Sequence, residues 1–108
     1  MRGQHVRMAF AYLVKCSDGS YYAGSAHDLD HRMWQHNFSP DEGAAYTRRR
    51  RPVTLVWHAE FEHIGAAFAF EKQIQGWSRA KREALIRGDF DSLPELASRP
   101  TARKGMQR

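Results

Sequence analysis

Runs of apolar residues predict two adjacent strands near the start of the chain. Residues 8–15 read Met-Ala-Phe-Ala-Tyr-Leu-Val-Lys, which is typical of a strand buried on much of both faces. The Ser-Asp-Gly-Ser stretch at 17–20 follows, and its Asp-Gly pair favours a tight hairpin. Residues 21–25 are expected to form the return strand, ending at Gly24, where another group could approach the backbone closely.

A helix is expected directly after this hairpin. Asp28 can cap its N-terminus, and Leu29 with Met33 forms an apolar pair one helical turn apart. Arg32 and His36 are also four residues apart, so they share another strip of the same helix. A loop containing a Ser-Pro pair then leads toward a run of arginines.

A third strand is predicted over residues 53–61. Its odd-numbered positions are all apolar, so they are expected to lie on one face of the sheet. These positions are Val53, Leu55, Trp57, Ala59 and Phe61.

Two further helices are predicted after this strand. Residues 65–76 are apolar at helical spacing, and Trp77 is expected to complete the buried stripe begun by Phe70. Ser78 is expected to cap a second helix, over residues 79–87, that ends at a glycine.

The predicted order of strand, strand, helix, strand, helix, helix defines an α+β fold. It corresponds to a small three-stranded antiparallel sheet flanked by helices. Within one domain, the expected organisation is an N-terminal extension at 1–7 and a core at 8–88. A short C-terminal helix is expected at 89–98, followed by a basic, disordered tail at 99–108.

Composition narrows the class of protein. A chain of 108 residues can bury one core. It contains no apolar stretch near the roughly 18 to 20 residues that a membrane span needs, and residues 1–8 do not resemble a secretory signal. Cys16 is the only cysteine, which excludes an internal disulfide and a multi-cysteine zinc site. A reducing compartment is expected, with the cytoplasm as the default location.

The positive charge is concentrated in a few places. The formal net charge is +5, and the last ten residues hold four basic residues and no acid. Two further clusters are the run Arg48 to Arg51 and the group Arg79, Lys81 and Arg82. Such clusters favour contact with a phosphate backbone, although a solvated loop and a solubilising tail would have the same composition.

Five residues could together carry phosphodiester chemistry. Tyr12 and Tyr22 are expected side by side on the hairpin, and Arg32 with His36 on the helix that follows. Arginine can hold a phosphate, histidine can move a proton near neutral pH, and Glu71 in the most apolar helix could bind a hard divalent cation. Phosphodiester hydrolysis needs an activated water and neutralisation of charge on the phosphate and the leaving oxygen.

Each of these residues also has a structural explanation when it is taken singly. A strand tyrosine can be a core residue with its hydroxyl at the rim. Arg32 could pair with Asp28, and His36 could be a cation at a helix C-terminus. Glu71 could be solvated at the edge of its helix, or paired with Arg79 or Lys15.

The spacing of the tyrosines adds a resemblance to a known family. Phe-Ala-Tyr at 10–12, ten residues before Tyr-Ala-Gly at 22–24, resembles the pair of motifs that names the GIY-YIG nucleases. The segment 25–36 is similar to the family's helix with an arginine and a histidine four residues later, and 69–74 is similar to the segment with its metal-binding glutamate. Within the two motifs, only the tyrosines and the last glycine are retained. The replaced positions are core-facing or spacing positions in the family, so the replacements bear on packing and not on chemistry.

Several shorter segments resemble one branch of that family in particular. This is the small, stand-alone bacterial branch related to the nuclease module of the excision-repair subunit UvrC. The resemblance covers the chain from about residue 10 to residue 85, and it includes segments 16–20, 45–47, 51–53 and 76–81.

The resemblance implies a metal-dependent endonuclease that hydrolyses DNA and acts in DNA repair. It implies that Tyr12 and Tyr22 flank the scissile phosphate, with His36 assisting the proton relay and Arg32 holding the phosphate. It implies that Glu71 binds one Mg²⁺ or Mn²⁺. Possible site-lining residues are Tyr46, Asn37 and Thr47. Expected nucleic-acid contacts are Arg48, Arg49, Arg50, Arg51, Arg79, Lys81, Arg82 and Trp34.

The expected substrate is defined by shape more than by sequence. The homing and restriction members of this family take their sequence preference from attached recognition domains, and the 108 residues are not expected to include such a domain. Single-stranded or branched DNA is therefore favoured, with RNA left open. The alternatives are a nucleic-acid-binding module that retains the fold without catalysis, and an interaction domain with incidental charge. Oligomeric state and the choice of metal stay open.

Overall fold

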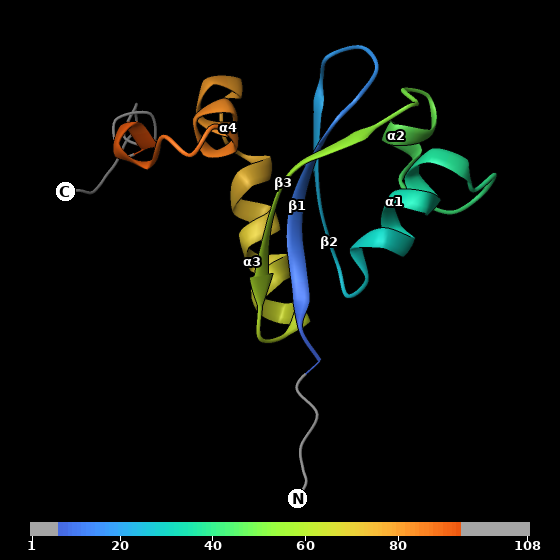
Figure 1. Ribbon diagram of the computed structural model, residues 1–108, viewed down its shortest axis with the longest axis horizontal. Coiled ribbons are helices and arrows are strands. Elements are labelled where there is room, and N and C mark those ends of the chain that lie inside the picture. Colours follow the sequence, from blue (N-terminus) through green and yellow to red (C-terminus); the bar gives the residue numbers. More distant parts are fainter. Residues whose placement is uncertain (1–6, 94–108) are drawn as a thin grey trace, which may run out of the picture. The chain divides into compact units, whose positions relative to one another are not determined.

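The protein forms a three-stranded antiparallel sheet with helices beside it, as the computed structural model shows for residues 7–93 (Figure 1). Strands β1 (Ala9–Lys15), β2 (Tyr21–Ala26) and β3 (Thr54–Phe61) are arranged in the order β2-β1-β3. Both pairs are antiparallel. The predicted α+β class and antiparallel sheet are confirmed.

The helices fall into two compact units of the chain. The first unit, Met1–Gln75, contains the sheet and helices α1 (Leu29–Phe38), α2 (Ala45–Arg48) and α3 (Ile64–Gln75). The second unit, Gly76–Arg108, contains helix α4 (Arg79–Ile86) and the 3₁₀ helix η1 (Phe90–Ser92). No helix among residues 7–93 is long and apolar enough to cross a membrane.

The two faces of the sheet carry different helices. On one face, the Phe70 ring of α3 lies 5.8 Å from that of Trp57 and 5.7 Å from that of Phe61. On the other face, Leu29 and Met33 of α1 pack against a buried cluster. In Figure 1, α3 runs along one side of the strands and α1 and α2 lie on the other. The cluster beside α1 consists of Tyr12, Val14, Cys16 and Val53, with Tyr22, Ala26 and Leu55 packed on it.

A β-bulge corrects the predicted face of the third strand. The β1–β3 register shifts between Leu13 and Val14, whose partners are Trp57 and Leu55. Adjacent residues of β1 point to opposite faces, and cross-strand partners share a face, so Trp57 and Leu55 lie on opposite faces. The prediction that all five odd-numbered residues share one face is therefore wrong. Val53 and Leu55 join the Tyr12 side instead.

The caps of two helices follow the sequence closely. Asp28 caps α1, because its Oδ1 accepts from the backbone N–H of His31 over 3.0 Å. Ser78 caps α4 by accepting from the backbone N–H of Lys81 over 3.1 Å. Gly88, with φ +76°, follows that helix in a conformation that favours glycine.

Other boundaries differ from the predicted ones. Helix α2 is four residues long and was not predicted. Helix α3 ends at Gln75, two residues before Trp77, and the Nζ of Lys81 lies 3.8 Å from the centroid of the Trp77 ring. The predicted helix at 89–98 corresponds in part to η1, and the rest of it lies outside the described residues, as does the tail at 99–108.

Candidate active site

A short chain of hydrogen bonds joins a buried tyrosine of the sheet to a buried histidine. The Tyr12 hydroxyl lies 2.7 Å from Nε2 of His36, and Nδ1 of His36 lies 2.8 Å from Oγ1 of Thr47. The Thr47 hydroxyl donates to the carbonyl of Ala44 over 2.9 Å. Tyr12 and His36 are each 1% exposed, and Thr47 is fully buried. The fold therefore brings together residues from β1, α1 and α2 that are distant in sequence.

Tyr12 reaches His36 because residue 24 has no side chain. A Cβ atom at Gly24 would lie 2.3 Å from the Tyr12 hydroxyl oxygen and 2.5 Å from its Cζ. Tyr12 pairs with Gly24 in the β1–β2 ladder, so its ring extends over the backbone of the neighbouring strand. The glycine of the second motif is therefore required by the packing of the tyrosine of the first.

Burial keeps both members of this pair uncharged. Desolvation, with help from the charges of Arg32 and Arg51, lowers the pKa of His36 from 6.5 to about 4. Desolvation raises the pKa of Tyr12 above its ordinary value, although the Arg32 guanidinium opposes this shift. A neutral imidazole does not fit the alternative of a cation at the C-terminus of α1.

The second tyrosine, Tyr22, also lies beside the His36 ring. The Tyr22 ring is half-buried, with its centroid 5.6 Å from that of His36 and 5.8 Å from that of Tyr46. The Tyr22 and Tyr46 rings are nearly parallel, at 22°. Burial and the Glu71 carboxylate raise the pKa of Tyr22, and the Arg32 guanidinium lowers it. Tyr22 is therefore within electrostatic range of both charged residues of the predicted site.

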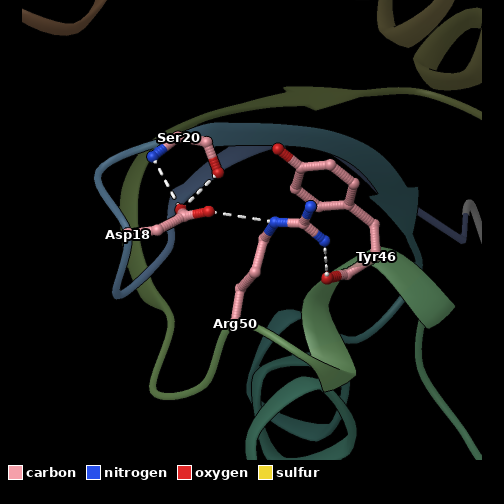
Figure 2. Close-up of polar contacts among 4 residues, drawn as sticks. All are labelled: Asp18, Ser20, Tyr46 and Arg50. Carbon is pink, nitrogen blue, oxygen red and sulfur yellow. Dashed lines mark hydrogen bonds and ion pairs between the residues drawn. The ribbon is translucent and has the colours of Figure 1, made fainter.

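Arg50, Asp18 and Ser20 form a clamp that holds Tyr46 in place (Figure 2). The guanidinium carbon of Arg50 lies 3.8 Å from the centroid of the Tyr46 ring. Arg50 donates to Asp18 in the hairpin turn over 3.0 Å and to the Tyr46 carbonyl over 2.9 Å. Asp18 also accepts from the backbone and hydroxyl of Ser20. The clamp thus ties α2 to the turn between β1 and β2.

Arg32 presents its guanidinium toward the tyrosines. It donates to the side-chain oxygen of Gln35 over 3.0 Å, not to Asp28, which caps the helix. Its Nε is buried without a hydrogen-bond partner among the described residues. Its charge lowers the pKa of both Tyr12 and Tyr22. A guanidinium beside two tyrosines is suited to hold a phosphate through charge-assisted hydrogen bonds.

Glu71 is buried and held by two neutral donors. Its side chain accepts from the Ser25 hydroxyl over 2.7 Å and from the Gln75 amide over 2.7 Å. The ammonium of Lys72 lies 4.0 Å away, and Glu71 is 7% exposed. Sequence reasoning missed Ser25 and Gln75. Gln75 follows Glu71 by four residues on α3, a spacing that was visible, whereas Ser25 is 46 residues away.

The donor set around Glu71 fits a weakly held hard cation. No group of three or more His, Cys, Asp or Glu side chains that could hold a metal occurs among residues 7–93. A single carboxylate with the Ser25 hydroxyl oxygen beside it suits Mg²⁺ or Mn²⁺, which keep several waters and often share substrate phosphates. The residues present are therefore compatible with one such cation bound together with a substrate.

The arginine run is largely engaged in internal contacts. Arg51 donates to three carbonyls at the end of α1, those of His36, Gln35 and Ser39, over 2.6, 3.1 and 2.5 Å. Arg48 donates to the carbonyl of Gly43 over 3.0 Å, and Arg50 donates to Asp18. Arg49 is exposed. Three of the four arginines therefore have structural partners.

Two other predicted residues occupy different environments. Asn37 donates to the carbonyl of Val53 over 3.0 Å and accepts from its N–H over 2.7 Å, so it joins α1 to the start of β3. Trp34 is 49% exposed on α1 and lies between His31, stacked at 6.0 Å, and Phe38, at 6.5 Å. Asn37 thus has a bonding role within the fold, and Trp34 presents an aromatic surface.

The basic cluster of the second unit is partly neutralised. Arg79 pairs with Glu83 over 3.1 Å. Lys81 is buried against Trp77, and desolvation lowers its pKa. Arg82 is half-buried.

Comparison with known proteins identifies the family of this chain. The sequence model of the GIY-YIG catalytic domain matches residues 8–84. The chain therefore belongs to the GIY-YIG family and carries a catalytic domain of the nuclease type. The resemblance that the tyrosine motifs predicted is confirmed.

The relatives are small proteins. The chain is 44% identical over 78 residues to UPF0213 proteins of Staphylococcus aureus strains Mu3 and Mu50, covering 72% of this chain and 93% of each relative. A solution NMR structure of the UPF0213 protein BH0048 from Bacillus halodurans is 30% identical, with a TM-score of 0.48. The match covers 89% of this chain and 99% of that one. The predicted small, stand-alone branch is confirmed.

Proposed function

We propose that the protein is a metal-dependent endonuclease that hydrolyses phosphodiester bonds of single-stranded or branched DNA. One observation carries the proposal. A tyrosine hydroxyl bonded to a neutral histidine lies in the electrostatic range of the Arg32 guanidinium and of the buried Glu71 carboxylate. Base, phosphate ligand and cation ligand are the components that phosphodiester hydrolysis requires.

Tyr12 and His36 would handle the proton of the attacking water. Tyr12 is protonated at neutral pH, because burial raises its pKa, so it cannot act as a base by ionising alone. The hydroxyl is 2.7 Å from Nε2 of a neutral imidazole that can accept its proton as the tyrosine oxygen takes one from water. The charge of Arg32 lowers the pKa of Tyr12, which favours release of its proton, and it also lowers the pKa of His36, which opposes uptake of that proton.

Arg32 would hold the scissile phosphate. A pocket of about 290 Å³ is lined by Ser25, which holds Glu71, and by Arg32 and Gln35. A phosphate placed there could receive a charge-assisted hydrogen bond from the Arg32 guanidinium. Tyr22, whose ring centroid lies 5.6 Å from that of His36, would flank the phosphate.

Glu71 would hold the cation. When bound, one Mg²⁺ or Mn²⁺ would neutralise charge on the phosphate and on the departing oxygen. Ser25 and Gln75 fix the orientation of the Glu71 carboxylate, so that its oxygens are positioned before substrate binds.

Two surface features support an unpaired or branched substrate. The exposed aromatic strip of α1, formed by His31, Trp34 and Phe38, can stack on unpaired bases without reading their sequence. Arg49 is exposed and can contact backbone phosphates, and Arg79 and Arg82 with Lys81 supply a second basic cluster.

The test is cleavage of labelled single-stranded, duplex and branched DNA with Mg²⁺, Mn²⁺ or EDTA. Glu71→Gln should abolish metal-dependent cleavage while DNA binding persists. Glu62→Gln is the matched control, because Glu62 is an exposed glutamate just before α3. Equal cleavage by wild type and Glu71→Gln would disprove the assigned cation site. Salt-sensitive binding without cleavage of any substrate would identify a non-catalytic binding module.

A further inference from the structure

The hydrogen bonds around His36 allow two proton arrangements. In the first, Nδ1 carries the proton and donates to Oγ1 of Thr47, while Nε2 accepts from the Tyr12 hydroxyl. In the second, Thr47 donates to Nδ1 and Nε2–H donates to Tyr12. The two arrangements differ in function, because only the first leaves Nε2 able to take a proton from Tyr12.

The first arrangement satisfies more of the buried donors. The Thr47 hydroxyl lies 2.9 Å from the Ala44 carbonyl, which can only accept, so its single proton is directed there. The oxygen of Thr47 is then free to accept from Nδ1–H. In the second arrangement the Tyr12 proton would have no acceptor among the contacts of that side chain, and Tyr12 is 1% exposed. A buried donor without a partner is costly, so the first arrangement is favoured.

We infer that Thr47 is a positioning residue that fixes the Nδ1–H tautomer of His36 and so aims Nε2 at the Tyr12 hydroxyl. Hydrogen-bond donation then runs in one direction: Tyr12 donates to His36, His36 donates to Thr47, and Thr47 donates to the Ala44 carbonyl. The catalytic consequence rests on the proposed nuclease function, whereas the tautomer itself does not.

The short helix α2 is built to hold Thr47 in this position. The backbone N–H of Thr47 and that of Arg48 both donate to the Ala44 carbonyl over 3.1 Å, which fixes that acceptor. The next residues anchor the helix on both sides, since Arg48 bonds the Gly43 carbonyl and Arg50 bonds Asp18. The arginine run thus contributes indirectly to the orientation of His36 through α2.

The experiment compares Thr47→Val with Thr47→Ser. Valine matches threonine in shape without the hydroxyl, and serine restores the hydroxyl. Thr54→Val, at an exposed threonine of β3, is the matched control. The tautomer of His36 is read from two-bond ¹H–¹⁵N correlations of the imidazole at neutral pH, without DNA, and kcat and KM are measured for cleavage. Urea unfolding checks that each variant is folded.

Wild type and Thr47→Ser should show His36 protonated at Nδ1, and Thr47→Val should shift it toward Nε2–H. The kcat of Thr47→Val should fall about 10- to 100-fold, with KM little changed and Thr47→Ser near wild type. An Nε2–H tautomer in wild type would overturn the inference, as would a Thr47→Val spectrum like that of wild type. A tautomer shift in a protein that cuts no DNA would support the inference and count only against the nuclease function. If Thr47→Val does not fold, the wild-type tautomer still decides.

Discussion

Replacing Gly24 with alanine should disrupt the site through packing alone. The added Cβ would lie 2.3 Å from the Tyr12 hydroxyl oxygen, and Tyr12 is fixed by burial and by its bond to His36. The tyrosine must therefore move. Overpacking of this kind costs about 1–3 kcal/mol. Loss of the bond, with Nε2 of His36 left buried, adds about 1–3 kcal/mol.

The expected net loss of stability for Gly24→Ala is roughly 1–5 kcal/mol, since alanine also restricts the unfolded chain by about 0.4–1 kcal/mol. Urea unfolding monitored by circular dichroism measures it, and cleavage should fall with it. Gly65→Ala is the control. Its Cβ would meet only the His63 side chain, at 3.3 Å, and alanine is the better helix former.

A double-mutant cycle isolates the contact. In a Tyr12→Phe background the overpacking part of the Gly24→Ala penalty should persist, because the Cβ still overlaps Cζ at 2.5 Å, and the part due to the lost bond should disappear. In a Tyr12→Leu background it should fall by more than about 1 kcal/mol, because leucine lacks the far end of the ring. A penalty below about 0.5 kcal/mol in the wild type, or an equal penalty in the leucine background, would refute the reasoning.

Three further predictions follow from individual side chains. Because the pKa of His36 is lowered to about 4, the unfolded chain binds a proton between pH 6.5 and 4 that the folded protein does not bind. The free energy of unfolding should therefore fall by about 3 kcal/mol as the pH drops from 6.5 to 4. Urea unfolding measures this pH dependence, and His36→Gln should remove most of it. Arg51→Ala should lower stability by about 2–4 kcal/mol, because three hydrogen bonds to the end of α1 are lost. Arg49→Ala should leave urea unfolding unchanged and weaken DNA binding in a salt titration. The reverse pattern would contradict both assignments. Asp28→Ala should cost about 1 kcal/mol through loss of the α1 cap, and an unchanged midpoint of thermal unfolding would contradict that contribution.

Much of the local structure could be predicted from the sequence because its causes are local. The Asp-Gly turn, the Asp28 and Ser78 caps and the apolar periodicities each depend on residues within a few positions of one another. They fixed the order of elements and the antiparallel sheet. The tyrosine spacing, with an arginine and a histidine in the next helix, was also enough to predict the family.

Other features depend on contacts between distant residues, and no periodicity encodes them. The bulge in β3 moves Leu55 to the other face because a ladder register is set by two strands together. A run of arginines looks the same in sequence whether it contacts phosphates or carbonyls, and only the fold places Arg51 at the end of α1.

The chemistry of the site divides in the same way. The sequence supplied Tyr12, His36 and Glu71 as residue types suited to moving protons and binding a cation. Only the tertiary structure made His36 neutral, because burial lowers its pKa, and gave Glu71 its partner Ser25 from 46 residues away. Residue type determines which reactions a side chain can take part in, whereas burial and long-range partners decide its charge, its orientation and the direction in which its proton moves.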